Sequence, residues 1–186
     1  MNKIFFTSDT HFGHDNVLRM DKRPFANVDE MQEQIIKKWN NKVSPGDIVY
    51  VLGDFIWNTR RASDIMKALN GQVILIQGNH DRVDSKMKKH LGGLKDSDFV
   101  HIKLEDGRVK ECILSHYFMP FYRNHYYGSI HLHGHSHSTK EHLEELRIAK
   151  ELNEKGFLNE IYNVGCMHWN YEPVTLDEIL KKEGKY

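Results

Sequence analysis

The fold is decided by the stretch Val73-Ile74-Leu75-Ile76-Gln77-Gly78-Asn79-His80-Asp81, in which a short aliphatic run leads directly into polar, turn-forming residues. A run of this length bounded by Gly and Asn is typical of a buried strand. Five further apolar runs have the same character, at residues 4–6, 48–52, 112–114, 130–132 and 161–164. The sequence therefore predicts a sheet structure built from short buried strands.

Helical patterns lie between several of these runs. Met31, Ile35 and Trp39 repeat at four-residue spacing, which places them on one face of a helix. The segment Thr175-Leu176-Asp177-Glu178 has the form of a capping box that opens a short helix. Strands that alternate with helices indicate an α/β fold, and the close spacing of the later strands favours a mixture of parallel and antiparallel pairing.

Length and composition fit one soluble domain that spans residues 1–186, with 39% hydrophobic and 28% charged residues. The 26 Lys and Arg residues balance the 26 Asp and Glu residues, so the net charge favours neither a long nucleic-acid track nor an anionic membrane surface. No apolar stretch is long enough for a signal peptide or a membrane span. Cys112 and Cys166 lie in no pairing motif. We therefore expect a cytoplasmic protein without a membrane partner.

Polar residues of a few types follow the predicted strands. The carboxyl ends of strands in an α/β sheet meet at one edge, which is where sites form. The residues delivered to that edge are Asp9-Thr10-His11, Gly53-Asp54, Gly78-Asn79-His80-Asp81, Ser115-His116 and Gly134-His135-Ser136-His137.

This set of carboxylate, amide and imidazole groups, without thiolates, suits Mn, Fe, Ni, Co or Zn better than Ca or Mg. Asp9 and His11 are two residues apart, so in an extended segment their side chains share a face, and the same holds for His135 and His137. Two ions about 3.5–4 Å apart can be held when one carboxylate bridges them. Asp54 is the natural bridge.

These five ordered blocks resemble the motifs of the calcineurin-like metallophosphoesterase superfamily. The resemblance extends from residue 4 to about residue 165. The opening Asp9-Thr10-His11-Phe12-Gly13-His14 and the small size are similar to the stand-alone bacterial or phage members rather than to the protein phosphatases. The resemblance implies a four-layer fold, in which a two-sheet β-sandwich is flanked by helices.

The resemblance also implies two divalent metal ions and a role for each motif residue. The ligands it implies are Asp9, His11 and His137 for the first ion, Asn79, His116 and His135 for the second, and Asp54 as the bridge. A hydroxide shared by the two ions would attack phosphorus. His80 would not bind metal but would stabilise the transition state and protonate the leaving oxygen.

The sequence departs from the family pattern in two places. Ser115 stands where a Gly is usual, a small change that should leave His116 in place. The segment Phe55-Ile56-Trp57-Asn58 lacks the Asp that protein-phosphatase-like members use near the catalytic histidine. The absence disfavours a protein-phosphatase role, and it leaves open whether Asp81 or a backbone carbonyl orients His80.

Other polar residues near the motifs have competing interpretations. We expect His131 and His133 to be hydrogen-bonded supports rather than ligands. His14, Asn16 and Arg23 are candidates for substrate contacts, although His and Asn in loops often serve local turns and loop arginines are often solvated.

Two longer segments could cover the site. The aromatic segment 117–127 could stack on a nucleobase or an aryl leaving group, but packing against the sheet edge is the favoured interpretation. The segment 138–155 is rich in Glu and Lys and is predicted to be a helix. It could form a lid or a dimer contact, and a surface helix is the default.

The favoured function is metal-dependent hydrolysis of a small phosphodiester or phosphomonoester, nucleotides included. The first alternative is a nuclease that acts on single-stranded or end-processed nucleic acid, which a basic stripe leading to the metals would favour. The second is a metal-binding interaction module with vestigial activity. The sequence gives no indication of the oligomeric state.

Overall fold

The first sheet consists of four parallel strands in the order β1-β2-β3-β4. The computed structural model describes residues 2–182 and residue 184. The strands are β1 (Ile4–Thr7), β2 (Ile48–Val51), β3 (Gln72–Ile76) and β4 (Gly93–Lys95). Because all four strands are parallel, their carboxyl ends lie at the same edge of the sheet.

The second sheet has mixed pairing and the order β5-β6-β7-β8. Its strands are β5 (Ser97–Lys103), β6 (Val109–Ser115), β7 (Ile130–His133) and β8 (Glu160–Asn163). β5 and β6 form an antiparallel hairpin, whereas β6, β7 and β8 are parallel to one another. The predicted mixture of pairing is therefore confined to this sheet.

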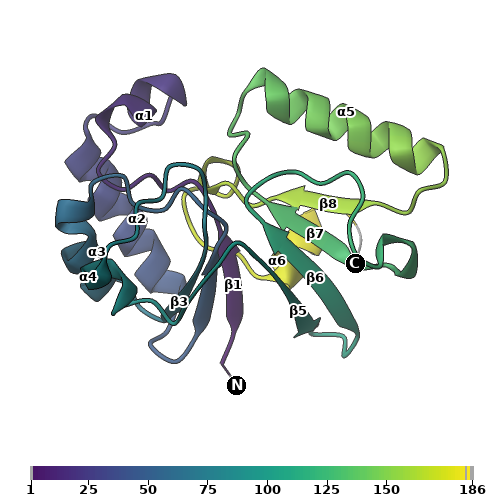
Figure 1. Cartoon of the computed structure of the whole chain (residues 1–186), viewed down its shortest axis with the longest axis horizontal. Helices are drawn as coiled ribbons and strands as arrows, with labels where there is room; N and C mark the ends of the chain where they lie inside the picture. Colours follow the sequence, from purple (N-terminus) through teal and green to yellow (C-terminus); the bar gives the residue numbers. More distant parts are fainter. Residues whose placement is uncertain (1, 183, 185–186) are drawn as a thin grey trace.

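The helices cover the outer sides of the two sheets, except that the last helix packs against the core between them (Figure 1). They are α1 (Asp15–Met20), α2 (Val28–Lys42), α3 (Ala62–Ala68), α4 (Ser85–Lys88), α5 (Lys140–Glu154) and α6 (Leu176–Lys182). Short 3₁₀ helices lie at Thr59–Arg61, His125–Tyr127 and Cys166–His168. The α/β fold with two sheets flanked by helices is confirmed.

The core has two parts that follow from this layering. Between the sheets, inward-facing residues such as Phe6, Leu114 and Leu132 pack with Ile179 of α6. On the outer face of the first sheet, α1 to α4 bury a second apolar cluster. Trp39, with Met31 and Ile35, is fully buried there, as the four-residue spacing predicts.

The outer face of the second sheet is covered partly by the aromatic segment that follows β6. Tyr122 is buried, its hydroxyl donates to the carbonyl of Glu160, and its ring centroid lies 5.4 Å from that of His131. The expectation that this segment packs on the sheet is therefore confirmed for Tyr122. Helix α5 lies beyond the same sheet, and Glu145 is its buried residue.

Local sequence signals account for most elements but not for all of them. The capping box forms as predicted, because the amide of Thr175 donates to Glu178 and the amide of Glu178 donates back to the Thr175 hydroxyl. Strands β4 and β5 were not predicted. β4 has only three residues, and in β5 exposed side chains alternate with half-buried or buried ones, so the strand forms no continuous apolar run.

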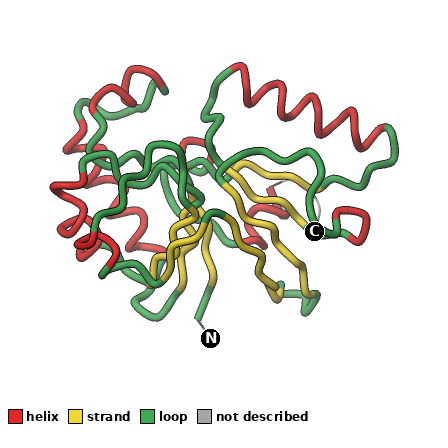
Figure 2. Tube along the Cα trace, viewed as in Figure 1, coloured by secondary structure: helices red, strands yellow, loops and turns green. Residues whose placement is uncertain are grey.

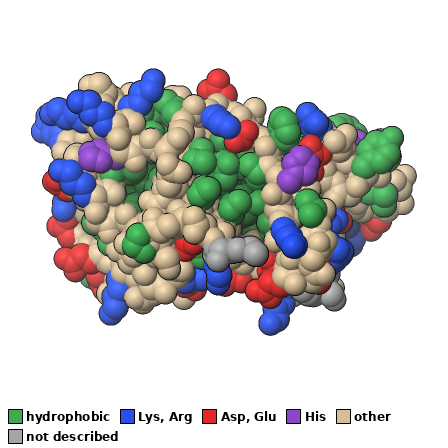
Figure 3. Space-filling view, turned by 90° about the horizontal axis from the view of Figure 1, so that it is seen from below, with side chains coloured by type: hydrophobic (Ala, Val, Ile, Leu, Met, Phe, Trp, Pro, Cys, Tyr) green, Lys and Arg blue, Asp and Glu red, His purple; other side chains and the backbone are tan. Residues whose placement is uncertain are grey.

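The end of the molecule opposite the strand carboxyl ends carries an apolar groove. It lies at the start of β1 and is lined by residues that include Ile4, Ile102, Leu104 and Leu176. Figure 3 shows this face, with hydrophobic side chains gathered at its centre. Among the described residues, no helix combines the length and apolar character needed to cross a membrane.

Replacing Leu132 by Ala should lower the free energy of unfolding by about 2–5 kcal/mol, because the side chain is fully buried between the sheets. Leu143→Ala is the matched control, since Leu143 is 63% exposed and its truncation should cost less than about 0.5 kcal/mol. Urea unfolding followed by circular dichroism measures both values. Equal losses in the two variants would contradict the packing described.

Candidate metal centre

Loops that follow strands of both sheets converge at one edge, above the strands in Figure 2. Backbone contacts join them directly. The amide of Asp9 donates to the carbonyl of Gly53 at 3.0 Å, and a parallel bridge between Ser8 and Gly165 links the two sheets. Side chains from separate parts of the chain are therefore brought to one place by the backbone itself.

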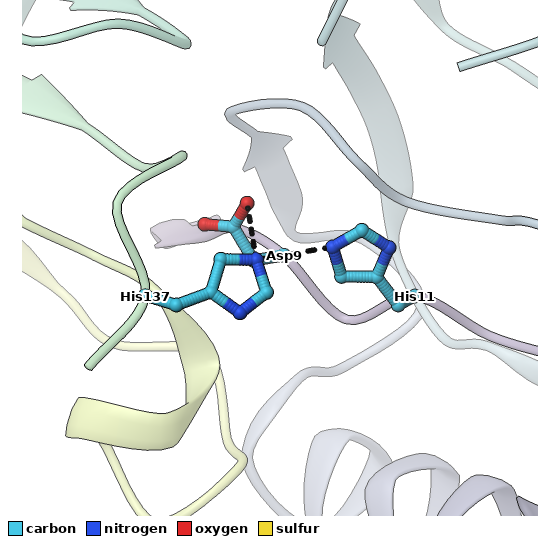
Figure 4. A group of neighbouring side chains, drawn as sticks. All are labelled: Asp9, His11 and His137. Carbon is cyan, nitrogen blue, oxygen red and sulfur yellow. Dashed lines mark hydrogen bonds and ion pairs between the residues drawn. The ribbon is translucent and has the colours of Figure 1, made fainter. Parts of the chain in front are cut away.

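The first group of candidate ligands is Asp9, His11 and His137 (Figure 4). The Nε2 atoms of His11 and His137 are 3.1 Å apart, and His137 Nε2 lies 3.6 Å from Asp9 Oδ1. Asp9 is fully buried, and burial raises the pKa of its carboxyl. Burial and the neighbouring His137 hold the pKa of His11 well below its usual value.

The second group is Asn79, His116 and His135. His116 Nε2 lies 2.9 Å from Asn79 Oδ1, and His135 Nδ1 lies 3.1 Å from the same oxygen. The two imidazole nitrogens are 3.2 Å apart. The three side chains thus direct their donor atoms at one point.

Asp54 lies between the two groups. Its Oδ2 atom is 3.6 Å from His11 Nε2 and 3.7 Å from His116 Nε2, while its Oδ1 atom accepts a hydrogen bond from the amide of His80 at 2.9 Å. Asp9, Asp54 and His116 also form a compact buried group of potential ligands. One carboxylate is therefore within reach of both groups.

The positions of the imidazole protons indicate what kind of site these side chains form. His116 Nδ1 lies 2.8 Å from the carbonyl of Leu52, so Nδ1 carries the proton and Nε2 presents a lone pair to Asn79 Oδ1, also an acceptor. His137 Nδ1 faces Asp21 Oδ2 at 3.3 Å, which likewise leaves its Nε2 as a lone-pair donor. Lone pairs that face one another repel unless a cation lies between them. The buried Asp and His clusters therefore have the character of a metal site with nitrogen and oxygen ligands.

Most of these ligands adopt left-handed backbone conformations. The φ angles are 56° for Asp9, 50° for His11, 52° for Asp54, 71° for His135 and 47° for His137. The condition of an extended backbone is therefore not met in Asp9-Thr10-His11 or His135-Ser136-His137, and their side chains converge through left-handed turns instead. Non-glycine residues rarely adopt positive φ, and such residues cluster at functional sites.

Glycines make the close approach of these loops possible. A Cβ atom on Gly53 would overlap His116 Nδ1, and one on Gly134 would overlap the Ser8 hydroxyl. Gly53 also has φ of 93°, which favours glycine by itself. Gly53 is therefore required both for the backbone turn before Asp54 and for the space that the His116 imidazole occupies.

His80 is exposed beside the two groups and its ring centroid lies 5.9 Å from that of His11. The buried carboxylate of Asp81 accepts hydrogen bonds from the amides of Gly78, Asp54 and Phe55. Asp81 therefore fixes the backbone on which His80 and Asp54 are placed, and its oxygens are occupied by amides rather than by the imidazole.

Three supporting residues were not identified from the sequence. They are Asp21, Glu145 and Asn163. Asp21 Oδ2 lies 3.3 Å from His137 Nδ1, and the buried carboxylate of Glu145 accepts a hydrogen bond from the Ser136 hydroxyl at 2.5 Å. The side-chain amide of Asn163 donates to the oxygen of that Ser136 hydroxyl at 3.0 Å. Their side chains face the ligand loops only after the chain has folded. The sequence carries no signal that singles out Glu145, because it is one of several acidic residues in the polar segment that forms α5.

The substrate contact expected for Arg23 does not fit its position. Arg23 is 5% exposed, and its guanidinium donates to the carbonyls of Asp9 and Thr10 and to Asp21. It supports the first ligand loop from beneath. His14 caps α1 by accepting from the amide of Val17, and its ring also lies 5.6 Å from that of His11.

Asn16 is exposed in the first turn of α1, where the structure assigns it no contact with the candidate ligands. The substrate roles of His14 and Asn16 remain predictions.

The strand histidines are supports, as expected. His131 is fully buried, its Nδ1 lies 3.1 Å from the Ile113 carbonyl, and its Nε2 accepts from the amide of Met119. Burial lowers the pKa of His131 from 6.5 to about 4. His133 is also buried and contacts the carbonyl of Gly134, the residue before the ligand loop.

Comparison with known protein families matches residues 2–182 to the calcineurin-like phosphoesterase model. The chain belongs to the calcineurin-like phosphoesterase family. The resemblance drawn from the five sequence blocks is therefore confirmed, and the matched residues include the buried Asp and His clusters.

Proteins similar to this chain come from an archaeon, phages and a bacterium. The uncharacterized protein MJ1445 of Methanocaldococcus jannaschii is 37% identical over 191 residues, which cover 100% of this chain and 94% of that protein. The Gene 66 protein of Mycobacterium phage D29 is 28% identical over 166 residues, covering 74% and 80% of the two chains. The crystal structure of AQ665 from Aquifex aeolicus, a protein of unknown function, matches with a TM-score of 0.71 and 26% identity, covering 98% of this chain and 100% of that chain.

Gly53→Ala should lower the affinity for Mn²⁺ or Zn²⁺ by about tenfold or more, because the added Cβ displaces His116. Gly107→Ala is the matched control, since Gly107 has a similar φ of 89° but open space around it. The two variants therefore share the backbone cost and differ in the contact with His116. Metal titration by calorimetry measures the affinities, and equal affinities would contradict the assignment of His116.

The buried His131 should make stability depend on pH. Because its pKa is lowered on folding, its contribution is complete above pH 6.5 and is lost as the pH falls through about 4. Over this window the free energy of unfolding of chelator-treated protein should fall, and His131→Gln should reduce the slope by up to about 1.4 kcal/mol per pH unit. His101→Gln, at an exposed position of β5, should leave the slope unchanged. Urea unfolding at several pH values measures the slopes, and an unaltered slope in His131→Gln would contradict the prediction.

Proposed function

We propose that the protein hydrolyses phosphoesters with the help of two divalent metal ions, one held by each group of ligands. The observation that carries the proposal is Asp54, whose Oδ2 atom lies within 3.7 Å of imidazole nitrogens from both groups. Nitrogen and oxygen ligands of this kind are compatible with Mn, Fe, Ni, Co or Zn. Two such ions, when bound, supply Lewis acidity that lowers the pKa of water and neutralises charge on the phosphoryl oxygens.

The proposed ligand set is the one implied by the family. It consists of Asp9, His11 and His137 for one ion, Asn79, His116 and His135 for the other, and Asp54 for both. In the reaction, the oxygen of water forms a bond to phosphorus, and the bond from phosphorus to the leaving alcohol breaks.

His80 is the proposed general acid. Its imidazole is exposed beside the ligands, and its amide is held by Asp54 Oδ1. An imidazole in that place can donate a proton to the departing oxygen and stabilise charge that develops there. Because the His80 ring belongs to neither group of proposed ligands, its removal should lower the rate of turnover strongly and change the affinity for metal little.

The proposed substrate class is a small phosphodiester or phosphomonoester. A net charge of zero supports a small substrate over long duplex nucleic acid, whose binding depends on many cationic contacts. A nuclease for single-stranded ends is the second candidate within enzymes, and a metal-dependent interaction module is the candidate from another class. The free, buried Cys112 and Cys166 are compatible with the reducing cytoplasm as the proposed location.

Metal-stripped protein should hydrolyse bis-p-nitrophenyl phosphate or p-nitrophenyl phosphate only after Mn, Fe, Ni, Co or Zn is restored. His80→Ala should lower kcat by about 100-fold or more while it retains both metals, because the ring is not a ligand. Asp54→Asn should lose metal and turnover together. His90→Ala, at an exposed histidine that contacts Ser63, is the control and should behave as wild type.

The outcomes separate the candidate classes. Metal-restored turnover that is lost in both site variants supports the hydrolase, and the preferred ester separates diesters from monoesters. Two bound metals without turnover on either ester would contradict the proposal and favour the interaction module.

A further inference from the structure

Trp57 is an exposed aromatic residue at the edge of the metal centre. Its side chain is 44% exposed, and its ring centroid lies 5.1 Å from that of His80 and 6.4 Å from that of His11. It therefore borders the proposed general acid and one ligand of the first group. The proposed mechanism leaves this indole without a role.

The other two tryptophans are integrated into the fold, which sets Trp57 apart. The indole N–H of Trp39 donates to the carbonyl of Asn70, and that of Trp169 donates to the carbonyl of Asn163. In the part of the chain that the structure describes, the indole N–H of Trp57 has no such acceptor. A large aromatic side chain left exposed beside a polar site contributes little to folding and is available to a ligand.

The ring is nevertheless held in a defined place. The amide of Trp57 donates to the carbonyl of Phe12 at 2.9 Å. The imidazole of His14 meets the indole edge to face, with centroids 4.0 Å apart and planes at 79°. His14 is itself fixed, because its Nδ1 atom accepts from the amide of Val17 at the start of α1. Trp57 is therefore a preorganised surface rather than a mobile side chain.

A second exposed ring borders the other group of ligands. Tyr117 is 50% exposed, and its centroid lies 4.7 Å from that of His135 and 5.0 Å from that of His116. Aromatic surfaces thus border both groups of ligands, Trp57 beside His11 and Tyr117 beside His135. A phosphodiester has an organic group on each side of phosphorus, whereas a monoester has only one.

We infer that Trp57 determines specificity by stacking on the base of the departing nucleoside, and that the substrates are nucleoside phosphodiesters. The inference rests on the proposed function, because it takes His80 as the group that faces the leaving oxygen. Stacking on an aromatic side chain tolerates any base and needs no run of cationic contacts, in agreement with the zero net charge. Tyr117 provides the corresponding surface for the other nucleoside.

The test compares esters whose reacting groups are identical. Wild-type, metal-loaded protein is given dithymidine phosphate and two analogues, each of which has a hydrogen in place of one thymine. The position of the phosphate in the products identifies the nucleoside that departs. Removing the base from that nucleoside should lower kcat/KM by about 5- to 150-fold in the wild type.

Variants assign this effect to the indole. Trp57→Ala should bring the ratio of kcat/KM for the complete and base-free esters close to one, and Trp57→Phe should restore most of the ratio because it retains an aromatic face. Tyr127→Ala is the control, since Tyr127 is 89% exposed in the 3₁₀ helix His125–Tyr127, and it should preserve the wild-type ratio.

The possible failures are distinguishable. If bis-p-nitrophenyl phosphate is hydrolysed but dithymidine phosphate is not, the nucleoside class is overturned and the proposed function stands. If the ratio is the same in wild type and Trp57→Ala, the stacking role alone is overturned. If no ester is hydrolysed with two metals bound, the proposed function fails, and the inference fails with it.

Discussion

Repulsion between lone pairs is the constraint on which the rest of this structure depends. His116 Nε2 carries a lone pair because its Nδ1 proton faces the carbonyl of Leu52. This nitrogen meets the amide oxygen of Asn79 at 2.9 Å and lies 3.7 Å from the buried carboxylate of Asp54. Such contacts oppose folding of the metal-free chain unless the surrounding structure enforces them. Here the enforcement comes from short strands that end at one edge, and from amides that bind the carbonyls and carboxylates of neighbouring loops. The fold is thus a rigid frame for groups that would otherwise separate.

The same frame explains why apolar packing and polar supports are both concentrated beneath the loops. Left-handed residues such as Asp54 and His137 and buried carboxylates such as Asp9 each reduce stability, so the two apolar clusters must outweigh them. Asp81 offsets part of this cost by accepting three backbone hydrogen bonds under Asp54. Divalent ions would remove the remaining repulsion. Stability and metal binding are therefore linked through the same atoms.

The sequence predicts well which side chains converge at the sheet edge, because each candidate ligand follows a strand whose apolar run is visible in the sequence. It predicts the supports poorly. Glu145 reaches Ser136 from a helix, and Arg23 turns beneath the loop of Asp9, so both contacts depend on tertiary placement that periodicity does not encode. The sequence also does not predict the left-handed turns, because nothing in the local sequence marks the Asp and His residues that adopt positive φ. β5 was not predicted because its exposed residues interrupt the half-buried and buried ones, so the strand forms no continuous apolar run.

The backbone around Asp9 is held in part by a residue near the other end of the chain. The amide of Cys166 donates to the carbonyl of Ser8, and its thiol contacts the carbonyl of Asp9 across 157 positions. During synthesis, the first ligand to leave the ribosome must therefore wait for nearly the last segment before its loop can close. Assembly of the centre is therefore a late event in synthesis, and a polypeptide that stops short of β8 and its following turn has all of the proposed ligands but not their arrangement.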